Sequence, residues 1–171
     1  LYGELHPRLL DDLELYAMMS MVAGRAGDAE AALLDALKIA EGVDGADSSA
    51  VGQLWVRLGD AYSVEGRLDE AIEAFATARA AFAKSGQAQS SWDAAALFGL
   101  GRVESAAGNL DGAIDYLRQA VEVRREARSV ELWMTVGTLA DTVTTRAQQQ
   151  LEQSSFLKAR RGFAICPKAL S

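Results

Sequence analysis

The stretch GRLDEAIEAFATARAAF at residues 66–82 decides the fold, because the chain spells it three times. It returns as GNLDGAIDYLRQAVEVR at 108–124 and, more faintly, as GRAGDAEAALLDALKIA at 24–40, so successive copies start 42 residues apart. A register this regular indicates a repeat architecture, in which each unit packs on its neighbours. The columns that align at this period are Gly24, Gly66 and Gly108; Ala29, Ala71 and Ala113; Leu33, Phe75 and Leu117; and Ala36, Ala78 and Ala120.

Each copy predicts a pair of helices. In the middle copy, apolar residues from Leu54 to Tyr62 recur at helical spacing and predict a first helix. Gly66 predicts its end, because glycine adopts the left-handed conformation of a helix C-cap at little cost. Asp69 then suits the positive end of a second helix, whose buried stripe includes Phe75. Neither helix can bury its apolar face alone, so neighbouring pairs must complete the core.

The middle copy resembles the tetratricopeptide repeat, a family in which two antiparallel helices, A and B, make each repeat. The positions that carry the resemblance are Trp55, Leu58, Gly59, Tyr62, Gly66, Ala71, Phe75 and Ala78. The third copy departs at Glu104, where an aromatic residue is usual, and the first departs at Ala17 and Ser20. The resemblance implies an all-α fold: a right-handed α-α superhelix, or solenoid, of about three to four stacked helix pairs.

A period of 42 residues exceeds the usual repeat of about 34 residues. The extra length lies between helix B and the next helix A, for example in EGVDGADSSA at 41–50. This resembles the long-repeat subclass found in kinesin light chains and in bacterial signalling proteins. The segment LYGELHP at 1–7 is similar to the Gly-x-x-His-Pro linker that precedes helix A in that subclass, so we interpret His6 as a linker residue.

The expected organisation is a single solenoid over residues 1–171. Its repeats are expected at about 8–42, 50–84 and 92–126, with a degenerate or capping unit at 130–166, since terminal repeats are often atypical. The chain begins with leucine rather than methionine, so we expect it to be a segment of a longer protein.

The last unit leaves two registers open. Trp133 begins a signature like that of a helix A, but it lies 36 residues after Leu97, whereas a strict period of 42 would place Leu139 there. A separate last helix is expected from about 150 to 165.

Composition limits the classes of function. The net charge is −7, and the first 85 residues carry 15 acidic and 7 basic side chains, so we expect no direct binding of nucleic acid. No window reaches the roughly 18 apolar residues of a membrane span. One cysteine, Cys166, and one histidine, His6, leave no multi-cysteine zinc site and little material for catalysis. We therefore expect a cytoplasmic protein without cofactor, metal or catalytic residues.

The family resemblance places the partner-binding residues on the helices A, which line the concave face of the superhelix. Arg57 and Arg102 are candidates for clamping a peptide carboxylate, because guanidinium geometry suits that group. Met18 and Met21 suit an adaptable binding surface, or else cover a neighbouring repeat. Gly99-x-Gly101 lies within a helix and lacks the preceding strand of a dinucleotide site. The full candidate set is Asp11, Glu14, Met18, Met21, Gln53, Val56, Arg57, Asp60, Ser63, Ala95, Phe98, Arg102 and Ser105.

The leading functional hypothesis is a protein–protein interaction scaffold that binds a peptide or partner protein in the groove lined by the helices A. The alternative is a regulatory or sensor arm of a larger bacterial signalling protein, such as a kinase, a transcription regulator or an ATP-driven switch. A second copy of the chain or a neighbouring domain of the same protein are further candidate partners. An enzyme has no support in the sequence.

Overall fold

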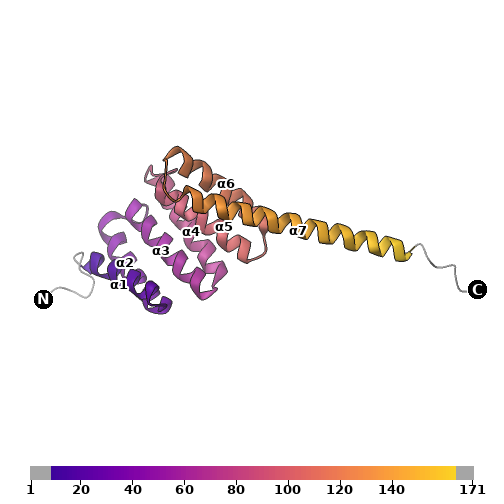
Figure 1. The fold of residues 1–171 in the computed structure, drawn as a ribbon. Helices are drawn as coiled ribbons and strands as arrows, with labels where there is room; N and C mark the ends of the chain where they lie inside the picture. Colours follow the sequence, from indigo (N-terminus) through magenta and orange to yellow (C-terminus); the bar gives the residue numbers. More distant parts are fainter. Residues whose placement is uncertain (1–8, 165–171) are drawn as a thin grey trace, which may run out of the picture.

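The computed structural model describes residues 9–164, and this part of the chain folds into seven α-helices without a strand (Figure 1). Each helix packs against the next one along the chain, α3 also contacts α5, and α5 contacts α7. The architecture is the all-α helical repeat superhelix that the sequence predicted. The helices are α1 (Leu10–Val22), α2 (Ala26–Asp44), α3 (Ser49–Glu65), α4 (Leu68–Lys84), α5 (Ser91–Ala106), α6 (Leu110–Glu126) and α7 (Leu132–Ala164).

Glycine turns and serine caps set the ends of the paired helices. Gly24, Gly66 and Gly108 follow α1, α3 and α5 and have φ angles of 72°, 75° and 85°. Residues with a side chain rarely adopt this left-handed backbone conformation. Ser48 and Ser90 precede α3 and α5, and each hydroxyl oxygen accepts a hydrogen bond from the backbone N–H three residues on. These local signals explain why the pairs begin and end where they do.

Large side chains of the B helices seat on glycines of the A helices. Phe75 of α4 is fully buried between Gly59 of α3 and Gly99 of α5, and a Cβ at either glycine would overlap its ring. Leu117 of α6 meets Gly101 of α5 in the same way. Gly99 and Gly101 are therefore packing positions, which let neighbouring helices approach closely.

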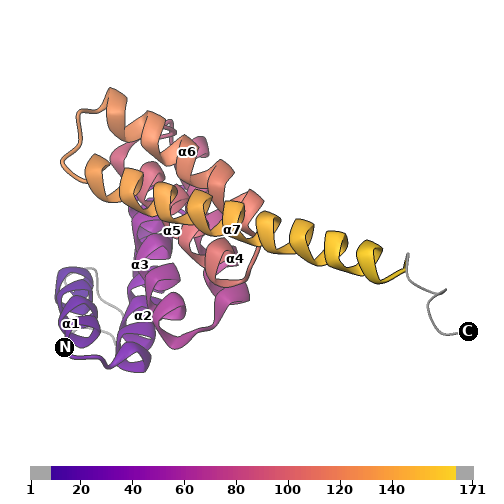
Figure 2. The ribbon, with the colours of Figure 1, turned by 45° about the vertical axis from the view of Figure 1, so that its right-hand side comes forward.

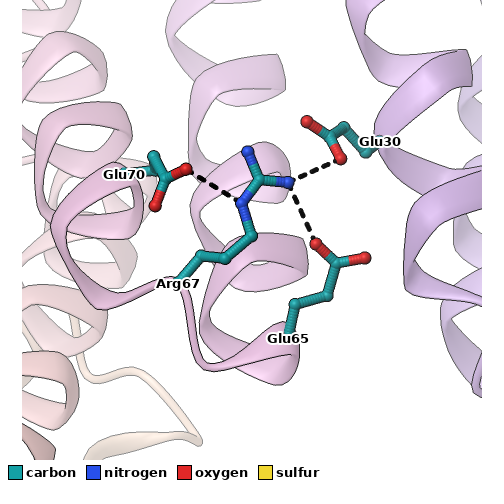
Figure 3. Close-up of polar contacts among 4 residues, drawn as sticks. All are labelled: Glu30, Glu65, Arg67 and Glu70. Carbon is teal, nitrogen blue, oxygen red and sulfur yellow. Dashed lines mark hydrogen bonds and ion pairs between the residues drawn. The ribbon is translucent and has the colours of Figure 1, made fainter.

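A cluster of charges around Arg67 ties the first helix pair to the second (Figure 3). The Arg67 guanidinium donates to Glu30 of α2 at 2.8 Å, to Glu65 of α3 at 3.1 Å and to Glu70 of α4 at 3.0 Å. These hydrogen bonds, the one to Glu30 first, raise the pKa of Arg67 above its ordinary value. The guanidinium also lies 4.2 Å from the centre of the Tyr62 ring.

The last helix differs from the prediction. α7 runs without interruption over Leu132–Ala164, 33 residues or about 50 Å, and its distal half projects beyond the other helices in both views (Figures 1 and 2). The expectation of a separate helix from about 150 to 165 is therefore wrong. Residues 138–161 contain neither glycine nor proline, so no residue of the kind that ends the other helices interrupts α7.

The structure also distinguishes the two registers that the sequence left open for this helix. Thr135 lies 36 residues after Gly99, is fully buried, and accepts a hydrogen bond from Arg124 of the preceding helix α6. Gly99 likewise meets Phe75 of the helix that precedes it, α4. Asp141, the equivalent in a strict period of 42, is exposed. Trp133 therefore takes the place of Leu97, and the proximal half of α7 occupies the position of an A helix.

Candidate functional site

A hollow opens on the face made by the A helices α1, α3 and α5. Its volume is about 340 Å³, within the range of roughly 300–1,000 Å³ that is usual for ligand sites. Side chains from four helices, far apart in the sequence, meet around it because the helix pairs stack in register. Its lining residues are Ala17, Met18, Met21, Leu33, Arg57, Asp60 and Trp92.

Arg57 lies at one side of this hollow and already forms an ion pair within the chain. Its Nη1 lies 3.2 Å from a carboxylate oxygen of Glu14 on α1, and its guanidinium carbon lies 5.6 Å from the centre of the Trp92 ring. Glu14 neutralises much of the Arg57 charge, so Arg57 is not a free clamp for a carboxylate. Its Nε, however, is buried without a hydrogen-bond partner among the described residues, so this donor is unsatisfied.

Asp60 supplies an acceptor one helical turn further along α3. Among the described side chains, no hydrogen bond and no ion pair engages its carboxylate. Burial raises the pKa of the Asp60 carboxyl above its ordinary value, and the charge of Arg102 on α5 opposes this effect. A half-buried carboxylate without a partner favours a ligand that brings a hydrogen-bond donor.

Arg102 and Ser63 line a smaller hollow of about 70 Å³ beside the first, together with residues of α4 and α5. Arg102 is exposed, has no ion-pair partner among the described residues, and lies 5.8 Å from the centre of the Phe98 ring. Ser63 donates its hydroxyl proton to the backbone oxygen of Gly59, so it offers only its oxygen to a ligand. Arg102 is therefore the guanidinium on this face that is available for an anionic group.

Four further candidates lie outside these hollows. Gln53 and Ser105 are half-buried and line none of these hollows. Val56 is only 3% exposed and belongs to the same buried cluster as Phe75, so its assignment to the partner-facing side is wrong: its side of α3 faces the core. Asp11 is exposed, and outside the hollows.

Two residues of this face escaped the sequence analysis. Trp92 lines both the main hollow and a third one of about 260 Å³, where Arg124 also lies. Arg124 is buried, its guanidinium carbon lies 5.0 Å from the centre of the Phe98 ring, and it donates to the Glu131 backbone oxygen. Burial lowers its pKa, while Glu131 opposes this. Trp92 precedes the candidate Ala95 by three residues, so extending that helical face by one turn would have found it.

The methionines of α1 separate into two roles. Met18 and Met21 line the main hollow, whereas Met19 is exposed elsewhere. Their flexible thioethers give the hollow a wall that can adapt to differently shaped apolar groups.

The described residues, 9–164, hold no site of two other kinds. They contain no group of three or more His, Cys, Asp or Glu side chains arranged to hold a metal ion, and no helix long and apolar enough to cross a bilayer. His6 and Cys166 lie outside the described residues.

The repeats of this chain are similar to those of known proteins. A family model described as Tetratricopeptide repeat matches residues 50–126. No curated protein sequence matches the chain. The crystal structure of BtubC (BKLC) from P. vanneervenii is similar over 99% of this chain and 69% of that one, with 19% identity and a TM-score of 0.75. TPR-like repeats of a protein from Podosopora anserina, named after kinesin light chain, match over 91% of this chain and 77% of that one, with 21% identity and a TM-score of 0.73. At these identities the structural likeness concerns the fold alone.

Proposed function

We propose that this chain holds a peptide or partner protein against the face of α1, α3 and α5, because residues 50–126 match the model of the tetratricopeptide repeat, a family whose members generally mediate protein–protein interaction. The observation that carries the proposal is the hollow of about 340 Å³, which joins an apolar wall to polar groups that lack partners. Such a combination is typical of a binding site rather than of a surface that only meets solvent.

The lining favours a peptide that inserts one bulky apolar side chain. Met18, Met21 and Trp92 provide the apolar contacts, and the Met side chains can rearrange around the guest. Asp60 then accepts a hydrogen bond from the peptide, and the Arg57 Nε donates one. Pairing both groups removes the cost of leaving them unsatisfied, which makes the contact specific as well as favourable.

A peptide selection tests the proposal directly. Peptides selected from a random library against the chain are labelled and titrated in fluorescence anisotropy, first with the wild type and then with Met21→Glu. The buried charge should weaken binding by at least about tenfold, since each 1.4 kcal/mol is a factor of about ten.

Thr77→Glu is the matched control, because it adds the same charge to an exposed position on the B helix α4. It should leave the affinity unchanged. Selected peptides that bind Met21→Glu normally but lose affinity for Thr77→Glu would place the site on the B helices and refute the proposal.

A further inference from the structure

The proximal half of α7 presents an A-helix face that no B helix covers. Leu97 of α5 is 2% exposed beneath α6, whereas its equivalent in α7, Trp133, is 78% exposed. A Cβ on Gly101 would lie 2.6 Å from Cγ of Leu117, whereas a Cβ on Gly137 would meet nothing within 4 Å. α7 therefore carries the notch for a B-helix side chain, and the notch is empty.

The reason lies at Thr144. In the closed pairs, Gly66 turns the chain seven residues after Gly59, and Gly108 does so seven residues after Gly101. Thr144 stands seven residues after Gly137 but is helical. The chain therefore runs straight on where the other repeats fold back.

The distal half of α7 nevertheless carries the pattern of a B helix. Ala147, Leu151 and Ser154 repeat the small–large–small spacing of the seated B-helix residues, which are Ala71, Phe75 and Ala78 in α4 and Ala113, Leu117 and Ala120 in α6. Leu151 is 69% exposed, and every residue from 147 to 157 is exposed. Both helices of a repeat are therefore represented in α7, but they follow each other in one continuous helix and do not pack side by side.

Closing this pair within one chain would leave too little chain for the turn. The B pattern starts five residues after Gly108 in the third repeat but only three residues after Thr144 in α7. The left-handed turn also needs a glycine, which α7 lacks there. The distal half is therefore suited to pair with another molecule.

We propose that two copies of this chain associate by exchanging these halves, with the two α7 helices antiparallel. Leu151 of each copy then seats on the partner's Gly137, and Trp133 of each copy is covered by the partner's α7. Each copy contributes the same residues to the contact, so the dimer has two-fold symmetry with its axis near Thr144, as in other swapped dimers.

Shape and charge agree with this arrangement. The distal half of α7 projects clear of the other helices, so each solenoid body lies at the opposite end of the helix pair (Figures 1 and 2). Antiparallel pairing about Thr144 puts Asp141 opposite residue 147, in the uncharged run AQQQL at 147–151. No like charges face each other there. Covering Trp133 alone removes roughly 150–250 Å² of surface from water in each copy.

Mass in solution is the first test. Analytical ultracentrifugation of the chain at micromolar concentrations should give twice the mass of one chain. Leu151→Glu should raise the dissociation constant by about tenfold or more, because it places a charge against Gly137. Phe156→Glu is the matched control: Phe156 is 68% exposed in the same half but lies about 140° around the helix from Leu151, so the dimer should persist. A single-chain mass for the wild type overturns the proposal, as does equal weakening by both variants.

Cross-linking tests the orientation. In a Cys166→Ser background, Thr144→Cys should form a disulfide-linked dimer on mild oxidation, because the two introduced thiols meet near the symmetry axis. Ser155→Cys should not, since the two thiols would lie about 33 Å apart along antiparallel helices. Efficient cross-linking at both positions would indicate parallel helices, and cross-linking at neither would indicate another interface; both results overturn the proposal. Circular dichroism confirms that each variant is folded.

Discussion

Phe75 occupies the space that a side chain at Gly99 would need: a Cβ on Gly99 would lie 2.4 Å from Cζ of the Phe75 ring. The same ring would meet a Cβ on Gly59 at 2.8 Å. One B-helix side chain thus fixes the distance both to its own A helix and to the next one, so it sets how the second and third helix pairs stack. Stacking in turn determines where the hollow among α1, α3 and α5 lies.

Gly99→Ala should therefore destabilise the chain although alanine favours helix. Crowding a packed core typically costs about 1–3 kcal/mol, and the ring cannot retreat because Gly59 bounds it on the other side. The helix propensity of alanine offsets about 1 kcal/mol of this cost. Urea denaturation measures the change. Gly42→Ala, where a Cβ meets nothing within 4 Å, should leave stability unchanged or slightly raised; equal losses for the two variants would contradict this account.

Phe75→Ala should be among the most damaging substitutions in the repeats. It leaves a cavity bounded by two glycines, whose backbones cannot fill it, so we expect a loss of about 3–5 kcal/mol in the free energy of unfolding. Phe156→Ala removes the same side chain from an exposed position of α7 and should cost less than about 0.5 kcal/mol in the monomer. Thermal unfolding of both variants decides the point, and a loss below about 1 kcal/mol for Phe75→Ala would show that the ring is not what sets the spacing.

Asp93→Ala should loosen the junction between α4 and α5. The buried carboxylate accepts hydrogen bonds from Arg79 Nε and from the backbone N–H of Gln89, both at 3.0 Å, and Gln89 has a left-handed φ of 64°. Losing both bonds should cost about 1–3 kcal/mol. Asp35→Ala breaks an exposed pair with Lys38 and should cost less than about 0.5 kcal/mol. Chemical denaturation compares the two, and similar costs would contradict the prediction.

Asp60→Asn should change how stability depends on pH. Burial holds the pKa of Asp60 in the folded chain above its ordinary value of 3.8, so the wild type loses stability as pH rises from about 4 towards that raised pKa. The variant has no such loss. Its stability relative to the wild type should therefore increase over this interval and then level off, by about 1.4 kcal/mol for each pH unit of the shift. Melting temperatures across the acidic range test this, and a difference independent of pH would refute it.

Much of the fold could be predicted from the sequence because the signals are local and repeated. Gly66 and Gly108 turn the chain where their spacing predicted, and Phe75 seats between neighbouring repeats as its column indicated. At the candidate site, four predicted residues meet in one hollow: Met18, Met21, Arg57 and Asp60. Stacking at a constant period brings equivalent positions of successive A helices to one face. The period alone therefore predicts which residues of these helices share the hollow.

The remainder depended on contacts between residues far apart in the chain. The pairing of Arg57 with Glu14, and the place of Trp92 in the hollow, follow from distances between helices that no periodicity states. Val56 has the spacing of a partner-facing residue, yet it is buried in the same core cluster as Phe75.

The sequence by itself determined the helices, their glycine turns and the repeat of 42 residues, because backbone conformation and apolar spacing act within a few residues. Only the tertiary structure decided which polar groups pair, which stay free, and which face of α7 is left uncovered. Thr144 shows the division: its sequence position matches that of the turn glycines, but the outcome rests on a missing glycine and on the neighbours that each half of α7 finds.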